Sequence, residues 1–272
     1  MGDDNLSKRI FSNILFDVSH PTSYLIKTYF QFFIDMISSK IHFTPNLSSE
    51  SFHWKRFYHQ CSIDNPNQII LPRETITKDS ILFALNRLKS EFKGNIYCLD
   101  VGCGPTSQFY TEQLKDDQQL QIISVDPLAE VYKEIHRKYK TGYNIECVKG
   151  YAETLNEIFP EKNFHLIYTQ NAIDHSQNPI NFFRQCYNLI IDGGYFILHG
   201  FIKEGTAAKW LGLHKWDIEV NENTLLLTDK HKNYNKFNIG QDCDLTLVYK
   251  KITGYNIGDM YTLIYKKTSM KV

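Results

Sequence analysis

Two acidic side chains follow two strand-like runs in a pattern typical of a nucleoside site. Asp100 lies at the end of the apolar run 96–101, directly before a glycine-bearing loop at 102–104, and Asp126 ends the second run, 120–125. Because the carboxyl ends of parallel strands meet at one edge of a sheet, these groups are expected to lie close together there. Glycine lets a backbone approach a ligand closely, and a carboxylate accepts hydrogen bonds from ribose hydroxyls.

The loop sequence separates the possible cofactors. A dinucleotide fingerprint needs a third glycine, where this chain has Ser107, and Pro105 stiffens the loop. This disfavours a nicotinamide dehydrogenase. A phosphate-binding P-loop is excluded because no Gly-Lys-Ser/Thr follows. S-adenosylmethionine, a nucleoside without phosphate, fits what remains.

Three histidines are expected near the same edge of the sheet: His175, His199 and His214. A histidine there can take the proton of an acceptor hydroxyl near neutral pH. His175 is the first choice for this base because it follows the predicted fourth strand, and Asp174 would orient it or bind the acceptor hydroxyl. His214 is the second choice. A divalent metal could replace the base, but Asp174 has no clear carboxylate partner in the sequence, so no metal is predicted.

Strand and helix patterns alternate from residue 94 onward, which indicates a doubly wound α/β fold. Strands are expected at 96–101, 120–125, 145–149, 164–169 and 195–199, helices at 106–115, 127–140 and 179–191, and two closing strands at 244–252 and 260–266. We expect this domain to span residues 89–272, with an insertion around 203–240 that includes a hairpin at 221–229.

Residues 1–88 have a different pattern, with apolar side chains at helical spacing in 6–16, 23–37 and 77–92. We predict a helical cap over the pocket of the following domain. Aromatic side chains crowd the segment 51–58, and rings stack well on sugar faces and cations. Tyr58 is therefore a candidate contact for the acceptor.

Composition narrows the class of protein. The chain has 272 residues, 42% of them hydrophobic, and its 30 Lys and Arg balance its 30 Asp and Glu. Such a balance gives no excess positive field for nucleic acid or an anionic membrane, so neither nucleic-acid binding nor stable membrane insertion is predicted. The six cysteines form no C-x-x-C pair, and the first residues are acidic and polar. Both features favour a cytoplasmic protein with reduced thiols.

Five features in order resemble the class I S-adenosylmethionine-dependent methyltransferases, of the type 11-like kind. They are the Leu-Asp-Val-Gly-Cys-Gly run at 99–104, the acid at 126, Gly-Tyr-Ala-Glu at 150–153, Gln-Asn at 170–171 and Gly-Gly at 193–194. The resemblance covers about two-thirds of the chain, from residue 94 on. It implies a Rossmann-like sheet that is mostly parallel, with the last strand antiparallel, and S-adenosylmethionine as cofactor, released as S-adenosylhomocysteine.

The resemblance also implies a role for each matching residue. Gly102 and Gly104 would lie beneath the ribose and methionine, Asp100 would hold the methionine amino group, and Asp126 would accept from the ribose hydroxyls. The adenine and the methionine side would contact a further set of residues: Pro127, Leu128, Ala152, Glu153 and Gln170.

Two short segments resemble a narrower subset, associated with bacterial surface polysaccharides. They are Asn-Ala-Ile-Asp-His at 171–175 and Leu-His-Lys-Trp-Asp at 213–217. The subset implies O-methylation of a small polar acceptor in capsule biosynthesis, such as a nucleotide-linked sugar or a phosphoramidate-type precursor. Asn171, His199 and Trp216 join Tyr58 as acceptor contacts. An N-methyltransferase, a lipid- or quinone-precursor methyltransferase and a non-catalytic cofactor-binding partner remain alternatives, and the protein is expected to be a monomer or a homodimer.

Overall fold

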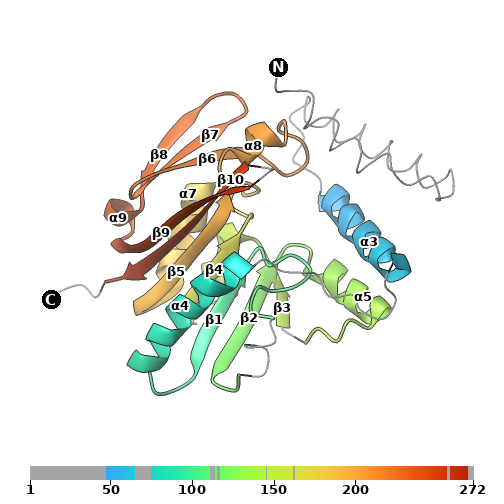
Figure 1. The fold of residues 1–272 in the computed structure, drawn as a ribbon, viewed down its shortest axis with the longest axis horizontal. Helices are drawn as coiled ribbons and strands as arrows, with labels where there is room; N and C mark the ends of the chain where they lie inside the picture. The colour runs from blue at the N-terminus through green and yellow to red at the C-terminus, as the bar shows by residue number, and fades with distance from the viewer. Residues whose placement is uncertain are drawn as a thin grey trace.

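A computed structural model describes residues 47–64, 75–110, 114, 117–144, 146–161, 163–255 and 258–268 of the chain. Its main body is a seven-stranded sheet in the order β3-β2-β1-β4-β5-β10-β9 (Figure 1). The strands are β1 (Ile96–Val101), β2 (Leu120–Asp126), β3 (Glu146–Lys149), β4 (Phe164–Gln170), β5 (Ile190–Phe201), β9 (Leu245–Tyr255) and β10 (Gly258–Lys267). The predicted helices at 6–16 and 23–37 lie outside the described residues.

The register of the sheet brings the predicted site elements to one edge. β1 pairs in parallel with β2 and β4, and β4 pairs in parallel with β5, while β10 runs antiparallel to both β5 and β9. The loops that follow β1, β2, β4 and β5 therefore all leave from the same end of the sheet. The predicted Rossmann-like sheet with its last strand antiparallel is confirmed.

Two helices cover opposite faces of the sheet, and the alternation of β1 explains how. Ile96 and Cys98 pack against α4 (Thr75–Glu91), whereas Leu99 and Val101 lie in the core that includes α7 (Pro179–Leu189). Successive side chains of a strand point to opposite faces, so one apolar strand serves both layers. The helix predicted at 77–92 therefore covers one face of the main sheet.

The predicted insertion forms a second sheet in the order β6-β7-β8. Its strands are β6 (Trp216–Asn221), β7 (Thr224–Asp229) and β8 (Tyr234–Asn238), and the short helices α8 (Glu204–Ala207) and α9 (Ile239–Asp242) flank it. Phe237 of β8 stacks on Phe183 of α7, with ring centroids 5.2 Å apart. The insertion therefore shares the core on the α7 side of the main sheet.

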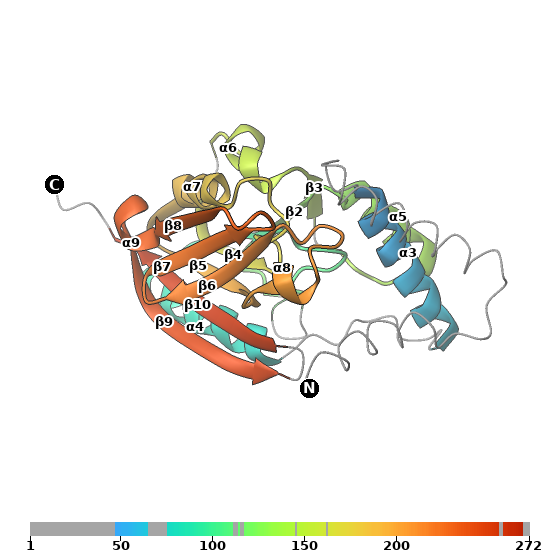
Figure 2. The same ribbon diagram turned by 90° about the horizontal axis from the view of Figure 1, so that it is seen from above.

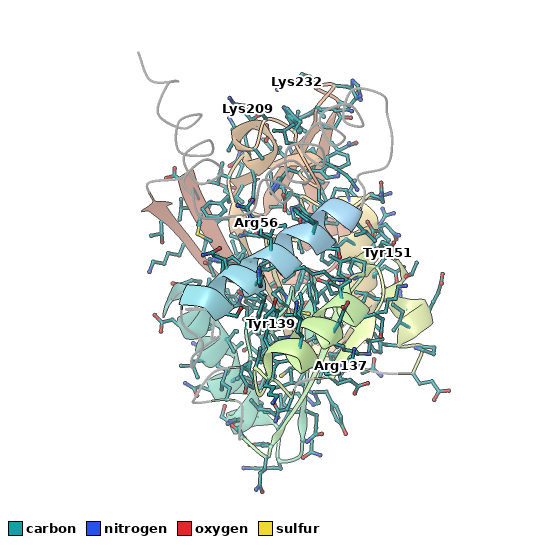
Figure 3. All side chains as sticks on the ribbon, turned by 90° about the vertical axis from the view of Figure 1, so that its right-hand side faces the viewer. Arg56, Arg137, Tyr139, Tyr151, Lys209 and Lys232 are labelled. Atoms are coloured by element: carbon teal, nitrogen blue, oxygen red, sulfur yellow. The ribbon has the colours of Figure 1, made fainter. Side chains whose placement is uncertain are left out.

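At the β3 edge of the main sheet, α3 (Leu47–Asp64) packs beside α5 (Ala129–Tyr139), as Figure 2 shows. Tyr58 of α3 is buried there and stacks on Tyr139 of α5 at a centroid distance of 6.2 Å. Figure 3 views this edge, with Arg56 on α3 and Arg137 and Tyr139 on α5. Helix α3 thus lies at the side of the glycine loop.

The segment after the glycine loop differs from the prediction. A helix was expected from residue 106, but residues 105–110 form turns. The amide groups that would begin a helix have other acceptors: Ser107 N donates to Tyr143 Oη, at 2.9 Å, and Gln108 N to Asp100 Oδ2, also at 2.9 Å. These two hydrogen bonds tie the segment to Tyr143 and to the end of β1 and hold its backbone in turns.

Candidate functional site

The glycine loop after β1 has the backbone conformation that the sequence predicts. Gly102 and Gly104 have positive φ values of 68° and 62°. Gly102 N donates to Val125 O at 2.8 Å, which ties the loop to the end of β2. A Cβ atom on Gly102 would lie 2.4 Å from the Cβ of Ala172. The loop after β1 is therefore in direct contact with the loop after β4.

Asp126 ties the same loop to the start of the next segment. Its Oδ2 accepts from Gly104 N at 3.1 Å and its Oδ1 accepts from Leu128 N at 2.8 Å. Burial raises the pKa of Asp126 to about 6. Asp100 is also buried, and its Oδ2 accepts from Ser107 Oγ at 2.6 Å. Asp126 thus holds the glycine loop, and Asp100 holds the turn that follows it.

The remaining predicted cofactor residues lie around this loop. Pro127 is half-buried, and Leu128 is buried in a cluster with Tyr58. Ala152 packs against the main core, and Gln170 Oε1 accepts from the hydroxyl of Tyr168 at 3.0 Å.

Glu153 has a structural contact that the sequence did not predict. Its Oε1 accepts from the backbone N of Gln177 at 2.6 Å and of Asn178 at 3.2 Å. It therefore anchors the loop between β4 and α7. Its predicted contact with the adenine stays a prediction.

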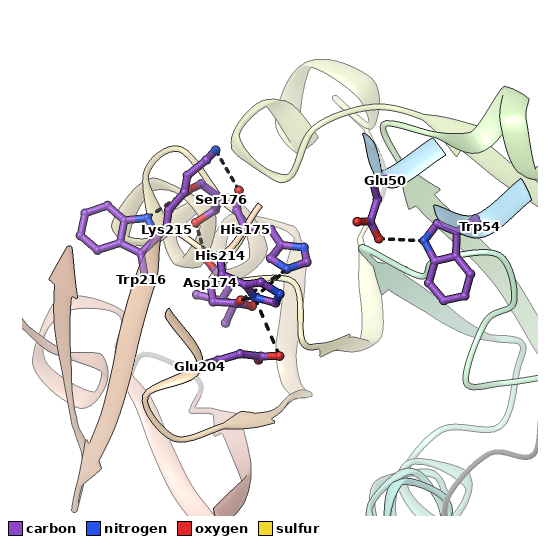
Figure 4. A network of polar contacts seen from close by, with 10 residues as sticks. Glu50, Trp54, Asp174, His175, Ser176, Glu204, His214, Lys215 and Trp216 are labelled. Carbon is purple, nitrogen blue, oxygen red and sulfur yellow. Dashed lines mark hydrogen bonds and ion pairs between the residues drawn. The ribbon is translucent and has the colours of Figure 1, made fainter. Parts of the chain in front are cut away.

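Asp174, His175 and His214 meet at one point, as Figure 4 shows. His214 Nδ1 lies 2.6 Å from Asp174 Oδ2, and His175 Nε2 lies 3.2 Å from His214 Nδ1 and 3.4 Å from Asp174 Oδ2. Asp174 is buried, and both imidazoles are partly exposed. Such a group can accept a proton from a bound hydroxyl, or its three ligand atoms can hold a cation.

The electrostatics of this cluster follow from its burial and its charges. Burial opposes the charge on Asp174, but the two imidazoles outweigh it and lower the pKa of Asp174. Burial lowers the pKa of His175, so this ring is neutral at pH 7. Burial also acts against protonated His214, yet the hydrogen bond and charge of Asp174 prevail and raise the pKa of His214. His175 is therefore available at pH 7 as an unprotonated ring that can accept a proton.

The Leu-His-Lys-Trp-Asp segment at 213–217 folds onto the loop after β4. Lys215 N donates to Asp174 O at 2.8 Å, Lys215 Nζ to His175 O at 3.1 Å, and Trp216 Nε1 to Ser176 O at 3.0 Å. These three hydrogen bonds bring His214 to Asp174 across 40 positions of sequence.

Two acidic residues next to the cluster were missed in the sequence. Glu204 of α8 has Oε1 3.9 Å from His214 Nδ1, and burial together with the Asp174 charge raises the pKa of Glu204 to about 8. Glu50 of α3 accepts from Trp54 Nε1 at 2.8 Å, and Figure 4 shows this pair across from His175. Neither glutamate belongs to a recognisable motif.

The predicted acceptor contacts have different surroundings. Tyr58 is only 1% exposed in the contact of α3 with α5, and His199 is 2% exposed, with Nδ1 2.8 Å from Thr262 Oγ1. This burial gives no support to a direct contact of either side chain with an acceptor. Asn171 has a left-handed φ of 46°, and its Oδ1 is buried with no hydrogen-bond partner among the described residues. Trp216 is half-buried beside the cluster.

Among the described residues, no helix combines the length and the apolar character that crossing a bilayer requires.

Comparison with known proteins places a family match on the central part of the chain. Residues 99–198 match the model of a family described as a methyltransferase domain. Two curated relatives are tRNA U34 carboxymethyltransferases. The protein from Pseudoalteromonas atlantica is 27% identical over 114 residues, which are 41% of this chain and 33% of the relative. The protein from Tolumonas auensis is 24% identical over 133 residues, 49% of this chain and 36% of the relative. The match thus spans about a third of each relative.

Solved structures with a similar fold include two methyltransferases. An S-adenosylmethionine-dependent methyltransferase from Clostridium acetobutylicum has a TM-score of 0.46 at 13% identity, covering 79% of this chain and 99% of that one. The N-methyltransferase NodS from Bradyrhizobium japonicum, in complex with S-adenosyl-l-homocysteine, has a TM-score of 0.45 at 11% identity, covering 71% of this chain and 88% of that one.

Proposed function

We propose that the protein is a class I S-adenosylmethionine-dependent methyltransferase that transfers a methyl group to a hydroxyl of a small polar acceptor. The match of residues 99–198 to a methyltransferase domain supports this proposal. The cofactor is S-adenosylmethionine. The contact between Asp174, His175 and His214 carries this proposal, because it sets a proton acceptor on the loop that touches the glycine loop through Ala172.

The chemistry is an in-line displacement at the sulfonium methyl group. The acceptor oxygen forms a bond to the methyl carbon while the carbon–sulfur bond breaks, and sulfur keeps the electron pair as the neutral thioether of S-adenosylhomocysteine. Asp174 Oδ2 faces Nε2 of His175, so Nδ1 of His175 is left to take the acceptor proton. His214 shares the same carboxylate oxygen and fixes its position. Alignment of the two reactants supplies a further part of the rate enhancement.

We propose a surface-polysaccharide precursor as the acceptor, such as a nucleotide-linked or phosphorylated sugar. Support comes from the resemblance of segments 171–175 and 213–217 to that subset and from their mutual contacts in the structure. RNA is a second candidate, because the two curated relatives are named for tRNA U34. The equal numbers of acidic and basic residues favour the small acceptor.

The test combines cofactor binding with methyl transfer. Purified protein is titrated with S-adenosylmethionine in a calorimeter, and transfer of a radiolabelled methyl group is then measured with nucleotide-linked sugars, sugar phosphates, a small amine and bulk tRNA. Asp126→Ala should abolish cofactor binding. His175→Gln should keep the affinity for cofactor and lower kcat by about 10²–10⁴-fold, the usual contribution of a general base. His231→Gln, on the exposed turn after β7, is the matched histidine control.

Each acceptor arm has a distinct meaning. If tRNA becomes radiolabelled and the sugars do not, RNA would replace the proposed acceptor. Wild-type rates in His175→Gln and His214→Gln would favour an amine, which needs no strong base. Cofactor binding without labelling of any acceptor would indicate a non-catalytic binding protein.

A further inference from the structure

We propose that Asp174, His175 and His214 form a binding site for a divalent transition-metal cation, with Zn²⁺ as the ion that fits best. The inference rests on the proposed function only for what the cation does to the acceptor. Binding of the cation depends on the three side chains alone, so the two proposals can fail separately.

The distances match those that a cation requires. Zn²⁺ binds nitrogen and oxygen ligands at about 2.0–2.2 Å, so two ligands of a tetrahedral ion lie about 3.3 Å apart. His175 Nε2 lies 3.2 Å from His214 Nδ1 and 3.4 Å from Asp174 Oδ2. The third distance, 2.6 Å between His214 Nδ1 and Asp174 Oδ2, is that of a hydrogen bond. A cation in place of the shared proton would widen it by about 0.7 Å.

The donor set selects the kind of cation. Two imidazole nitrogens with one carboxylate oxygen suit Zn²⁺ and its first-row neighbours, whereas Mg²⁺ and Ca²⁺ prefer oxygen ligands throughout. Three protein ligands also leave a fourth position for a substrate, as in catalytic zinc sites. Glu204 lies 3.9 Å from His214 Nδ1 and places a second carboxyl group beside the site.

The site is held by its surroundings. Asp174 is 3% exposed, and the backbone carbonyls of residues 174, 175 and 176 all accept hydrogen bonds from Lys215 or Trp216. The Lys215 ammonium group is thereby bound to a carbonyl. The side chains of His175 and His214 are 26% and 28% exposed, which leaves them free to turn slightly around an ion. These backbone contacts hold the segment that carries Asp174 and His175 next to His214.

The sequence predicted no metal because a second carboxylate beside Asp174 was the partner that was sought. The partners in the structure are imidazoles, and one of them comes from a segment 40 positions away. Spacing along the chain gives no sign of this ligand set.

A cation at this position would act on the acceptor as a Lewis acid. The acceptor oxygen would fill the open position, and its pKa would fall. Its proton would leave to solvent, which reaches the partly exposed imidazoles, and the resulting alkoxide would take the methyl group as described above. The cation would thereby replace His175 as the group that activates the hydroxyl, because the imidazole lone pairs are then used for binding.

The test measures the cation directly in the full chain. Protein stripped with a chelator is titrated calorimetrically with Zn²⁺, and separately with Mg²⁺. We expect one Zn²⁺ per chain and no comparable binding of Mg²⁺. His175→Gln and His214→Gln should each weaken Zn²⁺ binding by about 100-fold or more. Removal of a residue that only hydrogen-bonds to a metal ligand already weakens binding by about 10–100-fold, and removal of a ligand itself should cost at least as much. His231→Gln should bind like the wild type.

Two results would overturn the cation site. One is Zn²⁺ binding that is unchanged in both His175→Gln and His214→Gln. The other is Zn²⁺ binding by the wild type that is no stronger than the binding by these two variants. Both variants alter partly exposed side chains, and thermal unfolding checks that they fold. Histidine-dependent Zn²⁺ binding without methyl transfer would leave the cation site standing and refute the proposed function. Full methyl transfer by stripped protein that binds no Zn²⁺ would refute the cation site and leave the proposed function standing.

Discussion

Replacing Gly102 with alanine tests how closely the loops after β1 and β4 approach each other. The new Cβ would lie 2.4 Å from the Cβ of Ala172, at a residue whose φ is +68°. Two penalties add up. The left-handed conformation costs a non-glycine residue about 1–2 kcal/mol, and a steric overlap in a packed site costs about 1–3 kcal/mol. The free energy of unfolding should therefore fall by about 2–5 kcal/mol.

Gly104→Ala separates the two penalties. Gly104 has nearly the same φ, +62°, but its Cβ would only reach Trp54 Cζ2 at 3.9 Å, an ordinary contact. This variant should lose only the conformational part, about 1–2 kcal/mol. In the double variant Gly102→Ala/Ala172→Gly the overlapping atom is gone, so we expect a favourable coupling of about 1–3 kcal/mol between the two sites.

The assay is urea unfolding of the wild type, the three single variants and the double variant, with calorimetric titration of S-adenosylmethionine in parallel. A coupling energy below about 0.5 kcal/mol, the range of independent sites, would refute the contact between the two loops. So would equal destabilisation by Gly102→Ala and Gly104→Ala. Because Asp174 follows Ala172 by two positions, the same overlap should also lower the rate of methyl transfer.

Three further outcomes are expected. Burial raises the pKa of Asp126 to about 6. S-adenosylmethionine should therefore bind up to about tenfold more weakly for each pH unit below 6, because the protonated acid no longer accepts hydrogen bonds from the ribose hydroxyls as a carboxylate does. In calorimetric titrations, Asp126→Asn should lack this pH dependence. Burial lowers the pKa of His199 to about 4, below its unfolded value. The unfolded chain thus gains a proton first as pH falls, and the free energy of unfolding should drop by about 2 kcal/mol from pH 7 to pH 5 in urea titrations, but not in His199→Gln. Trp216→Phe removes the hydrogen-bond donor to Ser176 O, which should lower the free energy of unfolding by about 0.5–1.5 kcal/mol. The variant should also have a lower kcat at unchanged cofactor affinity. An unchanged kcat would show that this hydrogen bond does not position His214.

Local sequence predicted the main sheet because its signals lie within single elements. The runs that became β1, β2, β4 and β5 are apolar and end at turn residues, and a buried parallel strand needs no more than this. The expected helix at 106–115 fails over its described residues for a tertiary reason. Asp100 and Tyr143 supply acceptors for the amides of Ser107 and Gln108, and no local propensity reveals such partners.

The candidate site has one part that local sequence predicted and another part, the contact of His214 with Asp174, that it did not. Its cofactor half follows from the sequence, because Gly102, Gly104 and Asp126 sit at strand ends whose order along the chain fixes their place at one edge of the sheet.

The order of residues alone determined the fold class, the glycine loop and the choice of a nucleoside cofactor, since each depends on patterns a few residues long. Only the tertiary structure decided which side chains meet at the loop after β4. His214 reaches Asp174 across 40 positions, and Glu204 reaches His214 from another short element. These contacts depend on how the segment before β6 folds back onto the loop after β4. The hydrogen bonds that hold it there end on backbone carbonyls, which every residue possesses and which no sequence pattern marks.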